Sequence, residues 1–164
     1  MSNTGSGNPA PPVVALEQLR FAWRRGGPDV LSIDRLHLAA GEQVFVHGPS
    51  GCGKSTLLSV MAGVLLARSG QCRVLGQDWA ALAGARRDAF RADHVGVLFQ
   101  QFNLLAWLSV LDNLRLPGGF SRRRAAATGA DDAARLLQAM GLEEALWGRP
   151  ARELSVGQQQ RVAA

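Results

Sequence analysis

The sequence predicts an α/β fold in which a glycine-rich loop joins a buried strand to a helix. Residues 48–56 read GPSGCGKST and fit the pattern G-x-x-x-x-G-K-[ST] at every required position. Residues 42–47 have the composition of a short buried strand, and residues 55–66 predict a helix with one apolar side. Strand, loop and helix in this order are the arrangement that a phosphate-binding loop requires.

The residue types of this loop suit phosphate oxygens. Glycine allows backbone conformations that a Cβ forbids, so Gly48, Gly51 and Gly53 bring N–H groups close to an anion at the opening of a helix. We expect Lys54 to reach the β and γ phosphates and Ser55 to bind magnesium through its hydroxyl. The expected nucleotide-binding residues of the loop are Gly48, Pro49, Ser50, Gly51, Cys52, Gly53, Lys54, Ser55 and Thr56. The alternative is a glycine-rich turn that carries a lysine by chance, and the flanking strand and helix argue against it.

Composition restricts the class of protein. A chain of 164 residues with 47% hydrophobic residues has room for one globular domain. The net charge of +5 reflects clusters of arginine, which would suit nucleic acid or an anionic membrane. No aromatic residues interleave with these clusters to stack bases, so a solvated face is favoured. Cys52 and Cys72 have neither a C-x-x-C nor a metal-ligand spacing, which fits a reduced, cytosolic chain.

The first part of the chain predicts antiparallel strands. Residues 1–12 have almost nothing to bury and are expected to form a disordered leader. Strand character begins at residues 13–16 and 19–23, a turn follows at residues 26–29, and strand material returns at residues 30–31 and, with alternation, at residues 36–38. These strands are expected to lead into the strand that precedes the glycine-rich loop.

The middle of the chain carries both helix and strand signals. A turn at Ser69 and Gly70 precedes a strand at residues 72–75, and residues 80–91 predict a surface helix. Residues 95–99 form a nearly continuous apolar run, which predicts a strand covered on both faces. The helix after the loop places these apolar residues on one side: Leu57, Leu58, Met61, Ala62 and Leu65.

The last part of the chain is predicted to be helical. Ser109 is a suitable N-cap for a helix over residues 110–116, which Pro117 is expected to stop. Asp131 and Asp132 mark the first turn of a further helix, and Gly141 is expected to end it.

A final helix is expected to open at Ser155, because Ser155 and Gln158 have the spacing of a capping box.

With the run LSVGQ at residues 154–158, the chain resembles the ATP-binding subunits of ABC transporters, whose signature reads LSGGQ. The order of motifs is also that of the family. Trp23 matches the aromatic residue that stacks on adenine, residues 48–56 the Walker A loop and Gln100 the Q-loop glutamine. Residues that look most like exporters of the MacB, LolD and DevA kind are 99–105, 111–113 and 116–117.

This resemblance runs from about Val13 to the end and implies a P-loop NTPase of the ABC type. The implied fold is an α/β core with an N-terminal antiparallel β subdomain, over residues 13–100, followed by the Q-loop, a helical subdomain and the signature helix, over residues 101–164. Lys54 and Gln100 are implied catalytic residues, Ser55 and Gln100 implied magnesium ligands, and ATP and Mg²⁺ the implied cofactors. Outside this family context, Gln100 would be a polar residue at a strand end and Trp23 a core residue.

The resemblance also implies partners. In the family, the signature faces the γ-phosphate held by the Walker A loop of a second copy, in a head-to-tail dimer. We therefore expect Ser155, Gly157 and Gln158 to serve the partner's ATP, although the capping box by itself also explains Ser155 and Gln158. Val156 stands where the commonest signature has glycine, and its side chain is expected to point away from phosphate. The second implied partner is a membrane-spanning permease, with the chain at the cytoplasmic face of the inner membrane and no nucleic acid partner.

Three parts of the family's catalytic set have no counterpart in the sequence. The Walker B aspartate, the catalytic glutamate and the switch histidine follow the signature helix in the family, and His37, His47 and His94 all precede it. We therefore expect a truncated gene product or an incompletely determined sequence, catalytically incomplete and poorly stable alone. The alternatives are a non-hydrolytic ATP-binding remnant or regulatory fragment, a soluble ABC ATPase that acts on nucleic acid or ribosomes, and, most remotely, a guanylate kinase.

Overall fold

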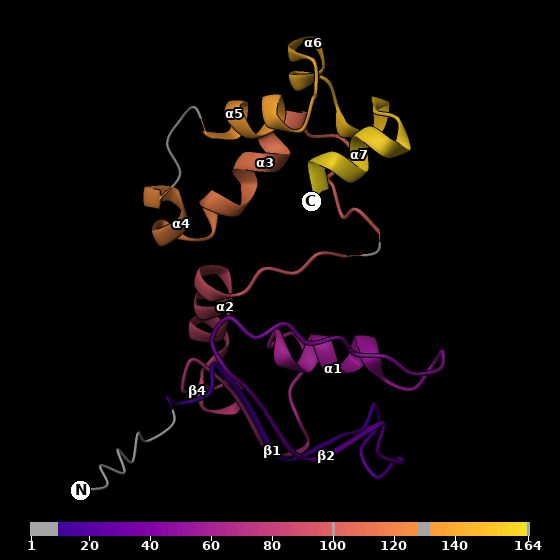
Figure 1. Cartoon of the computed structure of the whole chain (residues 1–164), viewed down its shortest axis with the longest axis vertical. Helices are drawn as coiled ribbons and strands as arrows, with labels where there is room; N and C mark the ends of the chain where they lie inside the picture. Colours follow the sequence, from indigo (N-terminus) through magenta and orange to yellow (C-terminus); the bar gives the residue numbers. More distant parts are fainter. Residues whose placement is uncertain (1–9, 100, 128–131, 164) are drawn as a thin grey trace, which may run out of the picture. The chain divides into compact units, whose positions relative to one another are not determined.

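The computed structural model describes residues 10–99, 101–127 and 132–163, and the chain divides into two compact units (Figure 1). Unit 1 is Met1–Arg87 and unit 2 is Asp88–Ala164. Gln100, Asp131 and most of the expected leader lie outside the described residues.

Unit 1 contains a four-stranded antiparallel sheet, two strands of which are the antiparallel strands that the sequence predicted. The strands are β1 (Val14–Phe21), β2 (Leu31–Leu38), β3 (Ser69–Val74) and β4 (Gln77–Asp78), in the order β2-β1-β3-β4. Strand β1 pairs with both β2 and β3, so it is the centre of the sheet.

A β-bulge in β1 replaces the turn that the sequence predicted at Ser69 and Gly70. Both residues belong to β3, and the register shifts between the pairs of Glu17 and Arg20, where Gln18 has a φ of 48°. A Cβ at Gly70 would lie 2.2 Å from the carbonyl oxygen of Gln18, so glycine is required there. The sequence signal was real, but it marked a close approach between two strands rather than a turn.

Helix α1 (Lys54–Met61) packs against β3 and is shorter than predicted. Gly63, at a φ of 70°, ends it: the N–H of Gly63 donates to Val60 O at 3.0 Å, and that of Val64 to Ser59 O at 2.9 Å. A Cβ at Gly63 would lie 2.7 Å from the ring of Trp79, a residue of the 3₁₀ helix η1 (Trp79–Ala81). Glycine at this position therefore suits both the end of the helix and the packing of the Trp79 ring.

The buried side of α1 differs from the prediction in part. Ala62 is buried as expected, whereas Leu58, another of the expected apolar-side residues, is 54% exposed, and Val60 is fully buried instead. Beside Val60, Cys72 of β3 is buried, and burial, with a further contribution from Asp78, raises the pKa of its thiol to about 12. Cys72 thus packs as a small apolar side chain.

Two predicted strands are wrong for the residues that the structure describes. Residues 42–47 and 95–99 belong to no strand, and their apolar side chains are exposed, Phe45 at 86% and Leu98 at 74%. An apolar run predicts a side chain that suits burial, but a strand also needs neighbouring backbone to accept and donate hydrogen bonds. The described sheet supplies no such neighbour for either segment.

Helix α2 (Gly84–His94) begins four residues later than the sequence predicted. The difference arises because Asp78 caps the intervening 3₁₀ helix, its carboxylate accepting from the Ala80 N–H at 3.0 Å. Leu82 is then extended, which separates the two helices.

Unit 2 is helical beyond α2, as predicted. Its elements are α3 (Val110–Gly119), α4 (Arg122–Ala127), α5 (Asp132–Ala139), α6 (Glu144–Trp147), the 3₁₀ helix η2 (Ala151–Glu153) and α7 (Val156–Ala163). Its core is formed by Val110, Leu137, Leu142, Leu154 and Val162.

Two of the predicted helix ends are confirmed and one is wrong. Ser109 caps α3 by accepting from the Asp112 N–H at 3.0 Å, and Gly141, at a φ of 67°, donates to Gln138 O at 2.9 Å beyond the end of α5. Pro117 does not stop α3, which continues to Gly119. Pro117 has no N–H to donate to the carbonyl of Asn113, yet the helix continues for two more residues before its C-cap Phe120.

Candidate functional site

The glycine-rich loop adopts backbone conformations that favour glycine. The φ angles of Gly48, Gly51 and Gly53 are 154°, 80° and 94°. A Cβ at Gly48 would lie 2.8 Å from Cys52 Sγ, and one at Gly53 would lie 2.9 Å from Leu31 Cδ2. A Cβ at Gly51 would meet nothing within 4 Å, so only its backbone angle requires glycine.

Lys54 lies at the centre of this loop. Its Nζ donates to the carbonyl oxygens of Gly48 and Pro49, both at 2.8 Å, and lies 3.8 Å from Cys52 Sγ. The loop therefore curls around a positive charge. An anion that entered the loop would meet this ammonium group together with the loop's backbone N–H groups.

The N-terminus of α1 has no side chain that caps it. The N-cap residue is Gly53, in the left-handed conformation, and the first turn contains no acidic residue. Ser55, in that turn, is exposed. Because the first N–H groups of a helix have no intrahelical partners, this opening favours an anion and leaves the Ser55 hydroxyl beside it.

Trp23 is presented at the end of the β1–β2 pair. It is 64% exposed and meets Phe21 edge to face, with ring centroids 5.1 Å apart. Phe21 pairs with Leu31, whose side chain also packs against Gly53 of the loop. The exposed indole and the loop are thus attached to the same end of two paired strands. The exposure of Trp23 fits a stacking surface better than the alternative of a core residue.

The start of α7 is closed by a reciprocal pair of hydrogen bonds, which confirms the predicted capping box. The Ser155 N–H donates to Gln158 Oε1 at 2.8 Å, and the Gln158 N–H donates to Ser155 Oγ at 3.3 Å. Gly157 has no heavy atom within 4 Å of a Cβ position, and the side chain of Val156 is 70% exposed. The contact of Ser155, Gly157 and Gln158 with a second copy's ATP stays a prediction, as does the role of Gln100, which lies outside the described residues.

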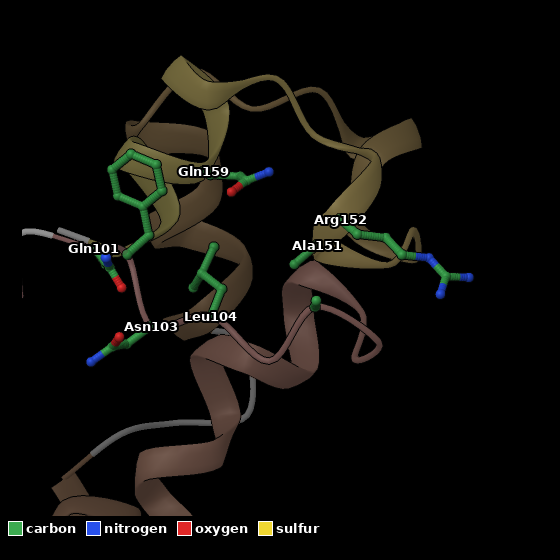
Figure 2. A pocket seen from close by; sticks show the side chains of 8 residues that line it. Gln101, Asn103, Leu104, Ala151, Arg152 and Gln159 are labelled. Atoms are coloured by element: carbon green, nitrogen blue, oxygen red, sulfur yellow. The ribbon is translucent and has the colours of Figure 1, made fainter.

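Unit 2 contains a hollow of about 500 Å³ (Figure 2). The first residues that line it, Gln101 and Phe102, follow Gln100 in the sequence. Leu104 and Gln159 approach it from different elements, with Ala151 at its side (Figure 2). The complete lining is Gln101, Phe102, Asn103, Leu104, Ala106, Ala151, Arg152 and Gln159.

Asn113 organises the loop that borders this hollow, a role that the sequence reasoning missed. Its Oδ1 accepts from the Leu105 N–H at 2.7 Å, and its Nδ2 donates to Leu105 O, Leu108 O and Ser109 O at 3.1, 3.3 and 2.9 Å. The Arg152 N–H donates to Ala106 O at 3.1 Å and joins the loop to η2. An asparagine one turn inside a helix after an N-cap serine is the signal that indicates such a clamp.

The arginine clusters are mostly solvated, as the sequence predicted: Arg24, Arg25, Arg86, Arg122 and Arg123 are exposed. Arg87 and Arg124 are half-buried, and Arg124 Nη2 donates to Val95 O at 2.8 Å. Among the described residues, no helix combines the length and apolar character needed to cross a membrane, and no group of three or more His, Cys, Asp or Glu side chains is arranged to hold a metal ion.

Comparison with known proteins places these features in one family. A family model described as "ABC transporter" matches residues 31–164. The lipoprotein-releasing system ATP-binding protein LolD of Novosphingobium aromaticivorans is 41% identical over 157 residues, which cover 93% of this chain and 68% of that protein. An uncharacterized ABC transporter ATP-binding protein of Mycobacterium tuberculosis (strain H37Rv) is 41% identical over 155 residues, which cover 92% of this chain and 46% of that protein.

Solved structures agree with the sequence relatives. The ATP-binding cassette MJ0796, in a dimeric post-hydrolysis state bound to ADP and Pi, superposes with a TM-score of 0.77 at 31% identity, covering 92% of this chain and 66% of that one.

A further sequence relative is the macrolide export ATP-binding/permease protein MacB of Bradyrhizobium diazoefficiens. It is 38% identical over a stretch that covers 93% of this chain and 23% of MacB. The chain thus spans between a quarter and two thirds of the length of these relatives, and about half of the mycobacterial one.

Proposed function

This chain belongs to the ABC transporter family, and we propose that it acts as the ATP-binding part of an exporter, coupling MgATP to a membrane partner. The observation that carries the proposal is the phosphate loop: three glycines at positive φ surround Lys54 at the uncapped opening of α1. Export as the direction of transport is supported by the likeness to proteins named for macrolide export and lipoprotein release.

Each residue of the loop has a role in holding the nucleotide. Gly48, Gly51 and Gly53 let the backbone N–H groups approach the phosphates. When ATP binds, Lys54 Nζ would leave the carbonyl oxygens of Gly48 and Pro49 and donate to the β and γ phosphates instead. The positive φ angles of the three glycines, the position of the Lys54 ammonium group and the exposed Ser55 hydroxyl fit MgATP. Bound magnesium neutralises phosphate charge, and Trp23 offers its face to the adenine.

A second copy of the chain is the first proposed partner. The start of α7 projects an open Gly157 and a solvent-facing Val156, which leaves the helix opening accessible to a phosphate held by another molecule. The post-hydrolysis structure of MJ0796 is described as dimeric, which supports a head-to-tail pair with ATP between the copies.

A membrane-spanning permease is the second proposed partner, with the chain peripheral to the cytoplasmic face of the inner membrane. We propose that the permease binds in the hollow of unit 2 whose lining begins at Gln101. Apolar groups from Phe102, Leu104 and Ala151 and polar groups from Asn103 and Gln159 line it, a mixture that suits a short amphipathic helix. Gln100, immediately before the hollow, is the proposed link between this contact and the nucleotide.

Nucleotide binding by the purified chain, with and without Lys54→Ala, tests the proposal. A fluorescent ATP analogue should bind the unchanged chain in the presence of Mg²⁺, and the substitution should weaken binding at least tenfold, because a charge-assisted hydrogen bond contributes about 1.5–3 kcal/mol. Phosphate release measured on the same samples separates the two possible activities. Release that Lys54→Ala abolishes indicates an ATPase, and binding without release indicates an ATP-binding module alone. Binding that Lys54→Ala leaves unchanged contradicts the proposal.

A further inference from the structure

We propose that Arg68 is a positioning residue for nucleotide binding, because it holds the turn that carries Trp23 in place. This inference rests on the proposed function, in which Trp23 stacks on the adenine. Arg68 lies between the end of α1 and the start of β3, and the sequence pattern of the nucleotide loop does not include it.

Three contacts join Arg68 to the β1–β2 connection. Its Nη2 lies 2.9 Å from Asp29 Oδ1, and its Nη1 donates to Gly27 O at 3.4 Å. Its backbone N–H donates to Arg20 O in β1 at 2.8 Å. The guanidinium group therefore contacts Gly27 and Asp29 in the turn, while the backbone of Arg68 is hydrogen-bonded to β1, the strand that precedes the turn.

The turn has few other constraints within the described residues. The Gly27 N–H donates to Arg24 O at 3.1 Å and the Val30 N–H to Phe21 O at 2.7 Å, and the exposed indole of Trp23 meets the Phe21 ring edge to face. The Arg68 side chain is 43% exposed and that of Asp29 29% exposed, so water only partly screens their interaction. Arg68 thus adds a side-chain clamp to a turn that is otherwise closed by two backbone hydrogen bonds.

The position of Arg68 in the chain gives the clamp its functional consequence. Helix α1 begins in the phosphate loop and ends at Met61, and the chain then leads through Gly63 to Arg68. In the proposed function, one segment therefore reaches the phosphates at its start and the Trp23 turn at its end. A turn that is already ordered loses less conformational entropy when adenine stacks on it, so the clamp strengthens the base contact and not the phosphate contact.

The experiment compares ATP with inorganic tripolyphosphate, which has phosphates but no base, as competitors for the fluorescent nucleotide. Arg68→Gln is expected to weaken ATP binding about threefold, the effect of one half-exposed ion pair, and to leave tripolyphosphate binding unchanged. Asp29→Asn should have the same effect, and the double substitution should be no worse than either single one. Arg68→Lys, which keeps the charge, should restore most of the ATP affinity.

Asp34→Asn is the matched control, because it breaks the Arg20–Asp34 ion pair of 3.0 Å on the same sheet without touching the turn, and it should change neither affinity. Equal losses for ATP and tripolyphosphate, or no loss with Arg68→Gln, would overturn the inference. A denaturation curve of each variant identifies loss of folding, and in that case Arg68→Lys and Asp29→Asn decide the outcome. If the unchanged chain binds neither ATP nor tripolyphosphate, the proposed function is wrong. If Trp23→Ala leaves ATP binding unchanged, the role assigned to the turn is wrong, and so is the inference about Arg68, while the proposed function stands.

Discussion

Two helices of this chain begin in opposite ways. Helix α1 starts at Gly53, which has no side chain to cap it, and the preceding loop is held open by glycines and Lys54. Helix α7 starts at Ser155, where a serine and a glutamine each bind the other's backbone N–H. Both openings carry the partial positive charge of a helix N-terminus, but only the first leaves its N–H groups free of side-chain partners.

The difference assigns different tasks to the two openings. In the proposed function, the α1 opening binds its ligand even in a single copy, since its glycine backbone geometry and Lys54 are already in place. The α7 opening is stable without a ligand, and its open Gly157 leaves room for a phosphate brought by another molecule. Substitutions at the two openings should therefore separate ligand binding from helix stability.

The largest effect is expected for Gly53→Ala. Alanine at a φ of 94° is strained, and its Cβ would lie 2.9 Å from Leu31 Cδ2, so the free energy of unfolding should fall by about 2 kcal/mol or more. ATP affinity should fall at least tenfold in the same variant. Chemical denaturation and nucleotide titration measure the two quantities.

Gly51→Ala is the control for this prediction, because its φ is also positive but its Cβ would meet nothing within 4 Å. It should cost only about 1 kcal/mol, from backbone strain alone. Equal costs at the two glycines would mean that contact with Leu31 does not matter.

A smaller effect is expected for Ser155→Ala. Loss of the cap should lower the free energy of unfolding by about 1 kcal/mol, without changing ATP binding by a single copy. Denaturation measured with and without MgATP tests both statements. Ser59→Ala is the matched control: Ser59 Oγ donates to Ser55 O at 2.9 Å within α1, and removal of such a bond costs little in a helix interior. A tenfold loss of single-copy ATP affinity with Ser155→Ala would contradict the proposed division of tasks.

The smallest effect on stability is expected for Gly157→Ala. The Cβ meets no neighbour and the backbone is not in the left-handed region, so the free energy of unfolding should stay within about 0.5 kcal/mol of the unchanged chain. Dimerisation driven by ATP, measured by sedimentation, should nevertheless weaken, because the new methyl group obstructs the approach of a partner's phosphate. Unaltered dimerisation would show that Gly157 does not face that phosphate.

Features determined by neighbours along the chain were predictable from the sequence. The phosphate loop, the Ser155–Gln158 capping box, the Ser109 cap and the Gly141 helix end each depend on residues within a few positions of one another. The antiparallel strands also followed from local alternation and turn residues. The physical reason is that caps, turns and glycine conformations are satisfied by the local backbone.

Features that depend on distant residues required the tertiary structure. Trp79 leaves no room for a Cβ at Gly63, Gln18 leaves none at Gly70, and Asp29 lies 2.9 Å from the Arg68 guanidinium group. Residues 42–47 and 95–99 have the apolar character of strands, yet no strand forms there in the described structure. Side-chain hydrophobicity is a property of the sequence, whereas the hydrogen-bond partners of a strand come from elsewhere in space, so only the folded chain determines whether a strand exists.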